Sequence, residues 1–200
     1  FPDLDQESPV FKQYASSALR FWIQQYLVDG FRYDATRWVG WKGYNDWGAG
    51  WFAYAAKQAD SNAIQIAEHL PSDPELIKKT EIDAGWDSEF RWRILDMLRN
   101  NALDSNEFIR VMEPARLGYD SMLQRIIYTE SHDEERVMKI MHDAGYSLED
   151  AARRAETALA LTLTAPGIPM LYAGQEFGES TPKKVGYNPL HWENLEQPIG

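Results

Sequence analysis

The hydrophobic pattern of the chain alternates between helical and strand-like segments. Apolar residues recur every three or four positions up to Tyr26 and predict a helix that Ser8 caps and Pro9 begins. We expect its buried face to hold Phe11, Tyr14, Ala15, Ala18, Trp22 and Tyr26. Asp29 and Gly30 are typical turn residues, so the helix should end there, before the first strand.

Short apolar runs mark candidate strands between the helical stretches. These runs centre near positions 31, 64, 83, 126 and 169. Helices are expected over 51–59, 88–98 and 147–163, and Ser147 with Asp150 forms a capping box at the start of the last one. A strand that alternates with a helix predicts parallel pairing and an α/β fold.

The length of the chain limits the size of this sheet. A complete TIM (β/α)8 barrel normally needs about 250 residues, whereas this chain has 200 and about five parallel βα units. The sequence therefore predicts one partial TIM barrel domain over residues 1–200. Its sheet edges should be covered by a second copy, by a second chain, or by the rest of a longer protein.

Composition excludes several classes of protein. The net charge of −11 disfavours a nucleic-acid partner, and the absence of cysteine excludes disulfides and Cys-ligated metal sites. No apolar run is long enough to cross a membrane, and no signal-peptide pattern opens the chain, although the sequence does not indicate a compartment. Aromatic residues are abundant, with 8 Trp, 10 Tyr and 8 Phe, and such rings fill cores or stack on sugar rings.

Three acidic residues follow predicted strands: Asp34, Glu68 and Asp133. In a βα barrel that position points a side chain into the mouth of the active site, whereas a single Asp after a strand often only caps a turn or helix. Arg32 lies two residues before Asp34 on the same strand face, where a guanidinium would keep the carboxylate ionised. His132 beside Asp133 could serve the same mouth or be structural.

Four segments in order resemble the α-amylase superfamily, glycoside hydrolase family 13. Residues 30–35 (GFRYDA) resemble its second signature motif, residues 66–68 (IAE) its third, and residues 131–134 (SHDE) its fourth. Residues 166–176 resemble the last barrel strand and its exit, and residues 2–5 the segment before the third barrel helix. The resemblance implies the part of the catalytic barrel from the third helix to the eighth strand and its exit loop. The first signature motif would lie upstream.

The resemblance also implies roles for the acids. Asp34 would be the nucleophile of a retaining mechanism, and Glu68 the general acid and base, with the two carboxyls about 5 Å apart. Apolar neighbours of Glu68 should favour its protonated form, while Arg32 holds Asp34 charged. Asp133 and His132 would bind sugar hydroxyls in the transition state. No cofactor and no metal site is expected, and Glu130, Glu134 and Glu135 should be ion-paired or solvated.

The sequence departs from the family pattern after the nucleophile. Many members have Lys-His three and four residues after it, where this chain has Arg37 and Trp38. Trp38, with Trp41, Tyr44 and Trp47, could form a platform for the acceptor sugar or pack beneath the loop.

Three functions remain open. The first is an α-amylase-type hydrolase of α-1,4-glucans, and the second is a transglycosylase such as a glucan branching enzyme. The third is a non-catalytic fragment that binds α-glucan, because a partial barrel need not hold the acids within catalytic tolerance.

Overall fold

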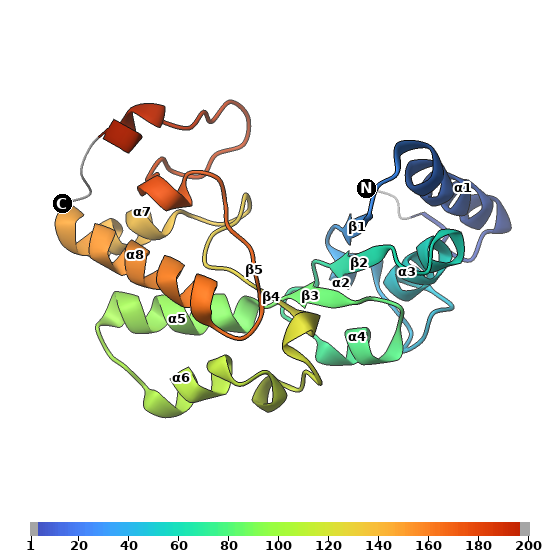
Figure 1. Cartoon of the computed structure of the whole chain (residues 1–200), viewed down its shortest axis with the longest axis horizontal. Coiled ribbons are helices and arrows are strands. Elements are labelled where there is room, and N and C mark those ends of the chain that lie inside the picture. The colour runs from blue at the N-terminus through green and yellow to red at the C-terminus, as the bar shows by residue number, and fades with distance from the viewer. Residues whose placement is uncertain (1–3, 197–200) are drawn as a thin grey trace. The chain divides into compact units, whose positions relative to one another are not determined.

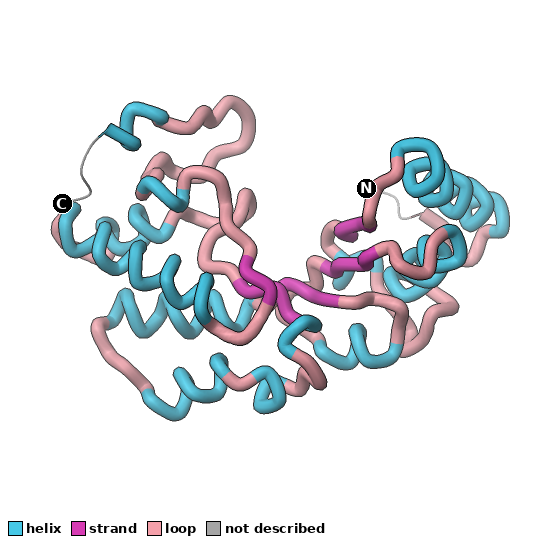
Figure 2. Tube along the Cα trace, viewed as in Figure 1, coloured by secondary structure: helices cyan, strands magenta, loops and turns pink. Residues whose placement is uncertain are grey.

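The computed structural model describes residues 4–196, so Pro2 and Asp3 of the motif that precedes the first helix lie outside the described residues. The contacts divide the chain into two compact units. Unit 1 runs to Trp86 and includes Gly118–Arg125, and unit 2 comprises Asp87–Leu117 and the chain from Ile126 onward. Figure 1 labels the helices and strands of both units, and Figure 2 shows the strands in magenta.

Unit 1 contains three parallel strands joined by helical crossovers. Its elements are α1 (Pro9–Tyr26), β1 (Gly30–Tyr33), α2 (Thr36–Val39), α3 (Gly48–Ala59), β2 (Ile64–Ala67), α4 (Pro74–Lys79), β3 (Ala84–Trp86) and a 3₁₀ turn at Met122–Gln124. Tyr33 pairs with Ala67 in the β1–β2 register, and Ile66 pairs with Ala84 in the β2–β3 register. The parallel βα pattern predicted for this part of the chain is confirmed.

Helix α1 begins as predicted, but its buried face was predicted only in part. The Ser8 hydroxyl accepts a hydrogen bond from the Phe11 amide at 3.4 Å, and Pro9 occupies the first turn. The buried side chains are Ala15, Leu19 and Ile23, four residues apart. Three residues of the predicted face are largely exposed, namely Tyr14, Trp22 and Tyr26.

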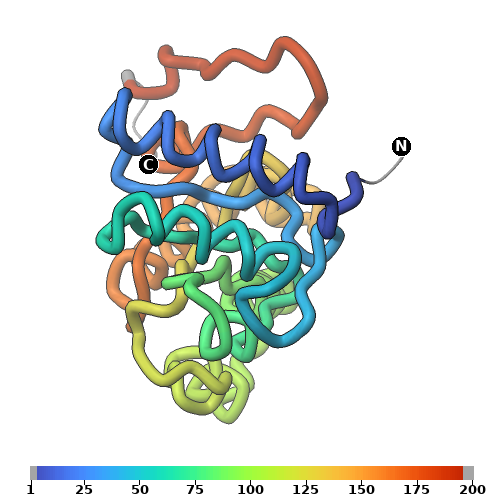
Figure 3. Tube along the Cα trace, turned by 90° about the vertical axis from the view of Figure 1, so that its right-hand side faces the viewer, coloured from blue at the N-terminus to red at the C-terminus, as the bar shows by residue number. Residues whose placement is uncertain are grey.

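The neighbour of α1 explains this difference. Leu19 and Ile23 pack against Ala56 of α3 and Ala63, and Figure 3 shows α1 running beside α3. Small and aliphatic side chains allow two helices to approach closely, whereas large rings would hold them apart. The rings of Tyr14, Trp22 and Tyr26 therefore lie on the outer face of α1, whereas Phe11, near its start, contacts Phe52 of α3 with ring centroids 6.0 Å apart.

Unit 2 contains the last two strands and helices α5 to α8. Its elements are α5 (Ser88–Asn100), α6 (Ser105–Met112), β4 (Arg125–Ile127, with Ile126 and Ile127 in this unit), α7 (Val137–Asp143), α8 (Leu148–Thr164) and β5 (Ile168–Pro169). The 3₁₀ turns lie at Pro114–Leu117, Gln175–Phe177 and Trp192–Glu196. Ile126 pairs with Ile168 in parallel, as predicted.

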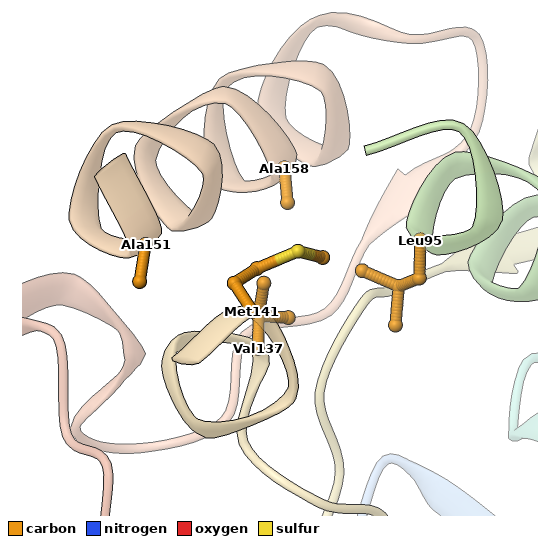
Figure 4. Close-up of a cluster of buried hydrophobic side chains, with 5 residues drawn as sticks. All are labelled: Leu95, Val137, Met141, Ala151 and Ala158. Atoms are coloured by element: carbon orange, nitrogen blue, oxygen red, sulfur yellow. The ribbon is translucent and has the colours of Figure 1, made fainter. Parts of the chain in front are cut away.

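A core of buried hydrophobic side chains joins three helices of unit 2. Figure 4 shows Met141 of α7 extending between Leu95 of α5 and Ala158 of α8, with Val137 and Ala151 beside it. Val137, Met141, Ala151 and Ala158 are fully buried. This core supports α7, and α7 begins directly after the loop that carries Asp133.

Candidate active site

The strand register places two of the three predicted acids at one edge of the sheet. Tyr33 and Ala67 are the last paired residues of β1 and β2, and Asp34 and Glu68 follow them directly. The Glu68 amide donates to the Tyr33 carbonyl at 3.0 Å and so extends the ladder by one step. Asp34 and Glu68 therefore leave neighbouring strands at the same level, as the spacing of their motifs predicted.

One arginine contacts both carboxylates. The Arg32 Nη1 atom lies 2.5 Å from Asp34 Oδ1, and its Nη2 atom lies 2.8 Å from Glu68 Oε2. The guanidinium carbon is 4.6 Å from the centre of the Trp86 ring, so a cation–π contact supports the same rotamer. Because both acids touch a single guanidinium, their carboxyl groups converge on one point.

The two acids differ strongly in exposure. The Asp34 side chain is 77% exposed, whereas the Glu68 side chain is 8% exposed. Glu68 Oε2 also accepts a hydrogen bond from the Ala35 amide at 2.8 Å. The apolar setting expected for Glu68 is therefore wrong in one respect, because its buried carboxylate is ion-paired with Arg32 and hydrogen-bonded to the backbone.

The turn after Asp34 is built on Glu68. The amide and the hydroxyl of Thr36 each donate to the Glu68 carbonyl at 2.9 Å. Ala35, which lies between Asp34 and Thr36, has a left-handed backbone with φ of +46°. This conformation costs a non-glycine residue about 1–2 kcal/mol. Such strained residues cluster at functional sites, and here the strained residue directly follows the candidate nucleophile.

A mostly apolar cavity of about 400 Å³ opens beside Asp34 within unit 1. Arg32 and Asp34 line it, together with Leu19 of α1 and Phe52 of α3. Because the Asp34 side chain is largely exposed and borders this cavity, its carboxylate is open to a ligand.

His69 also contacts this turn, although no sequence pattern assigned it a role. Its Nδ1 atom lies 3.1 Å from the Thr36 hydroxyl. Burial lowers the pKa of His69, the nearby Arg37 also lowers it, and Asp73 opposes the effect. The signal that sequence reasoning overlooked is its position directly after Glu68.

Trp38 is the most exposed tryptophan of the aromatic group, at 85%. Tyr44 is 70% exposed, whereas Trp47 is half-buried and Lys42 lies over its ring at 4.8 Å. The group therefore divides: Trp38 and Tyr44 present rings to solvent, and Trp47 packs in the loop. The Arg37 side chain donates a hydrogen bond to the Leu70 carbonyl at 3.4 Å.

In unit 2, the segment after β4 presents His132 and Asp133. His132 Nε2 lies 3.2 Å from Asp133 Oδ2, and their side chains are 56% and 53% exposed. The Asp133 amide donates to the Ser131 hydroxyl at 3.2 Å, and the Glu134 amide donates to the Ser131 carbonyl at 3.2 Å. The backbone of this turn is thus hydrogen-bonded, while the two polar side chains that the motif singled out are solvent-accessible.

The acids beside Asp133 have structural partners. Glu130 is 2% exposed and accepts hydrogen bonds from Arg136 Nη1 and the Val137 amide, each at 2.8 Å. Burial raises the pKa of Glu130, and these two hydrogen bonds oppose that effect. Glu134 pairs with Arg91 at 3.1 Å.

Glu135 accepts a hydrogen bond from the Lys183 amide at 2.8 Å. Glu130 and Glu134 are thus ion-paired, as predicted, whereas the partners of Glu135 are backbone amides. Within residues 4–196 no group of acidic or histidine side chains could hold a metal ion. In the same part of the chain, no helix is long and apolar enough to cross a membrane.

Comparison with known proteins agrees with the sequence motifs. A family model described as the alpha amylase catalytic domain matches residues 1–198. The cyclomaltodextrin glucanotransferase of Geobacillus stearothermophilus is 26% identical over 182 residues, which cover 87% of this chain and 23% of that protein. The alpha-amylase MalA of Haloarcula japonica is 28% identical over 180 residues, covering 86% of this chain and 23% of that protein. The chain thus spans about a quarter of these relatives.

A solved structure shows the same fold. The alpha-amylase of Geobacillus thermoleovorans, crystallised with acarbose, matches with a TM-score of 0.76 at 24% identity. The match covers 98% of this chain and 44% of that one. The predicted fold, part of a (β/α)8 barrel with parallel strands, is confirmed.

Proposed function

Because the chain belongs to the α-amylase family and matches its catalytic domain, we propose that it carries the catalytic acids of a retaining glycosidase that acts on α-1,4-glucans. We further propose that residues 1–200 contribute to a single catalytic barrel domain. The observation that carries the proposal is the contact of Arg32 with both Asp34 and Glu68. A retaining mechanism requires two carboxyl groups about 5 Å apart, and one shared guanidinium holds such a pair together.

In this mechanism the two acids have separate tasks. The Asp34 carboxylate attacks the anomeric carbon, and the bond from that carbon to the leaving oxygen breaks. Glu68 donates its proton to the leaving oxygen and then removes a proton from water, whose oxygen displaces Asp34 from the sugar. The exposed carboxylate of Asp34 suits the nucleophile, and Glu68, which contacts the same guanidinium, lies beside it on the neighbouring strand as the proton carrier.

The remaining roles rest on the motif of the second unit. Asp133 would hydrogen-bond sugar hydroxyls more strongly in the transition state than in the ground state, and His132 would do the same. The mechanism needs no cofactor.

Turnover of a 4-nitrophenyl maltooligosaccharide by the full chain tests the proposal. Asp34→Asn should reduce kcat by about 10³-fold or more, because the amide cannot form the glycosyl ester. Asp46→Asn is the matched control, since Asp46 is exposed and lies outside the site. Unchanged turnover in Asp34→Asn would exclude Asp34 as the nucleophile.

A second experiment tests the general acid. Glu68→Gln should be slow on a natural maltooligosaccharide but partly restored on a substrate with an activated leaving group, which needs no proton. An equal loss on both substrates would exclude the acid role of Glu68. If the unaltered chain binds maltooligosaccharide and turns over neither substrate, the binding-only alternative is correct for the isolated chain.

Transfer to a sugar acceptor is the second candidate activity, and the exposure of Trp38 favours it. An indole that is 85% exposed, four residues after the nucleophile, can stack on an acceptor ring and compete with water for the glycosyl enzyme. Trp38→Ala should then lower the ratio of transfer to hydrolysis. Reducing ends that rise on starch without new branch points would exclude a branching enzyme.

A further inference from the structure

A buried glutamate in unit 2 closes a long surface loop. The loop comprises residues 180–191, and its two ends meet at the carboxylate of Glu179, which is 2% exposed. Oε1 accepts from the Ser180 amide at 2.9 Å, from the Thr181 amide at 2.8 Å and from the Thr181 hydroxyl at 2.6 Å. Oε2 accepts from the His191 amide at 2.8 Å. Charge-assisted bonds of this kind are stronger than neutral ones, so the loop has a fixed base.

The side chain of His191 reinforces this closure. Its Nδ1 atom lies 2.8 Å from the Thr181 hydroxyl and 3.3 Å from Glu179 Oε2. Within the loop, the Asn188 side-chain amide donates to the Pro182 carbonyl at 3.4 Å. These bonds hold the loop in one conformation, although most of its side chains are exposed.

The closed loop reaches the turn that carries Asp133 through a single residue. The Lys183 amide donates to Glu135 Oε1 at 2.8 Å, and the Lys183 ammonium donates to the backbone carbonyl of Asp133. Lys183 therefore contacts Asp133 and Glu135, the two residues that flank Glu134. The Lys183 ammonium thus contacts the backbone of Asp133, the residue whose side-chain carboxylate the proposed mechanism requires.

Lys183 completes the restraint of this turn. Ser131 holds the amides of Asp133 and Glu134, whereas Glu130 holds Arg136 at the end of the turn. Within residues 4–196, the hydrogen bond to the Asp133 carbonyl comes from the Lys183 ammonium. A carbonyl fixed in this way fixes the peptide plane, and the peptide plane in turn restricts the direction of the Asp133 side chain.

We propose that Lys183 is a positioning residue for the Asp133 carboxylate, held in place by the loop that Glu179 closes. This proposal rests on the proposed function, because it assumes that Asp133 contacts the sugar in the transition state. Lys183 itself acts through the backbone of Asp133. A loop after the last strand thereby becomes part of the catalytic apparatus.

Lys183→Met is the informative variant. It removes the ammonium but keeps the backbone amide that binds Glu135, so the loop stays attached at that point. We expect kcat on a 4-nitrophenyl maltooligosaccharide to fall by about tenfold to hundredfold with KM within about twofold, as for a small misplacement of a catalytic group. Lys183→Arg should restore most of the loss, because it also places a cation at the carbonyl. Lys184→Met, which changes the exposed neighbouring lysine, should behave like the unaltered chain.

Amide hydrogen exchange separates this proposal from the proposed function. The amides of Asp133 and Glu134 should exchange faster in Lys183→Met than in Lys184→Met, whether or not the chain turns over substrate. Exchange that is identical in the two variants would overturn the contact. A normal kcat in Lys183→Met, in a chain whose turnover Asp133→Asn abolishes, would overturn the positioning role. Unchanged turnover in Asp133→Asn would exclude the proposed role of Asp133 in the transition state. The positioning role of Lys183 would then fail as well, even if hydrogen exchange still responds to Lys183→Met.

Discussion

Substitution of Glu179 by Gln tests the electrostatics of the loop directly. Burial raises the pKa of Glu179, but the hydrogen bonds from Thr181 and His191 outweigh burial and hold the pKa at about 2, below the ordinary 4.5. Glutamine has no charge, and its NH₂ group would face amide donors that need an acceptor. The variant should therefore lose the stability that the ionised carboxylate contributes.

The size of this loss follows from the pKa. A fall from 4.5 to about 2 corresponds to roughly 3 kcal/mol at about 1.4 kcal/mol per unit, and solvent screening at the loop surface reduces this to about 2 kcal/mol. A carboxylate whose pKa is lower in the folded state stabilises the fold fully above its unfolded pKa. That contribution disappears as the pH falls from about 4.5 towards about 2.

Urea unfolding at several pH values measures the effect. The difference in unfolding free energy between the unaltered chain and Glu179→Gln should be about 2 kcal/mol at about pH 7 and should shrink steadily below about pH 4.5. Glu176→Gln is the matched control, because its exposed carboxylate accepts one amide, that of Gly174 at 2.8 Å. A difference that stays constant from about pH 7 to about pH 2.5 would refute the charge argument.

Four further substitutions test the packing. Ile23→Ala should lower the unfolding free energy measured in urea by about 2–4 kcal/mol. Tyr14→Ala, at a position that is 72% exposed, should lower it by less than about 0.5 kcal/mol. A larger loss in Tyr14→Ala than in Ile23→Ala would support the buried aromatic face predicted from the sequence. Met141→Ala should cost about 2–5 kcal/mol by the same measurement, because it leaves a cavity at the centre of a buried hydrophobic core. Gly30→Ala places a Cβ 2.0 Å from the Ile64 carbonyl oxygen, so β1 and β2 would have to move apart. The variant should lose about 1–3 kcal/mol of unfolding free energy, seen as a thermal midpoint several degrees lower. An unchanged midpoint would contradict the close approach of β1 and β2.

The positions of Asp34 and Glu68 could be predicted from the sequence because they depend on local signals. Each acid ends a short apolar run, and parallel strands bring their carboxyl ends to one edge. The second partner of Arg32 could not be predicted in this way. Its contact with Glu68 depends on the register between β1 and β2, which pairs Arg32 with Ile66, and no feature within either strand sets that register.

Helices were predicted less evenly than strands. The long helix α8 was recognised from its capping pattern, and the Ser147 side chain does accept a hydrogen bond from the Asp150 amide. The short helices α4, α6 and α7 were missed, because six to eight residues hold too few turns for a period to stand out. The loop base at Glu179 was missed for a related reason, since its partner His191 lies twelve positions away and the bonds are mostly to backbone amides.

Glu68 combines two tasks that most substitutions would remove together. Its carboxylate binds the Ala35 amide, and its carbonyl holds Thr36, so it shapes the strained turn that presents Asp34. Glu68→Ala would delete the proton carrier and also release the Ala35 amide, and the nucleophile would then lose part of its support. Glu68→Gln keeps an acceptor oxygen for that amide while it removes the acidic proton. Only the glutamine variant therefore separates proton transfer from the positioning of Asp34, and restored activity on an activated substrate has a clear meaning in that variant alone.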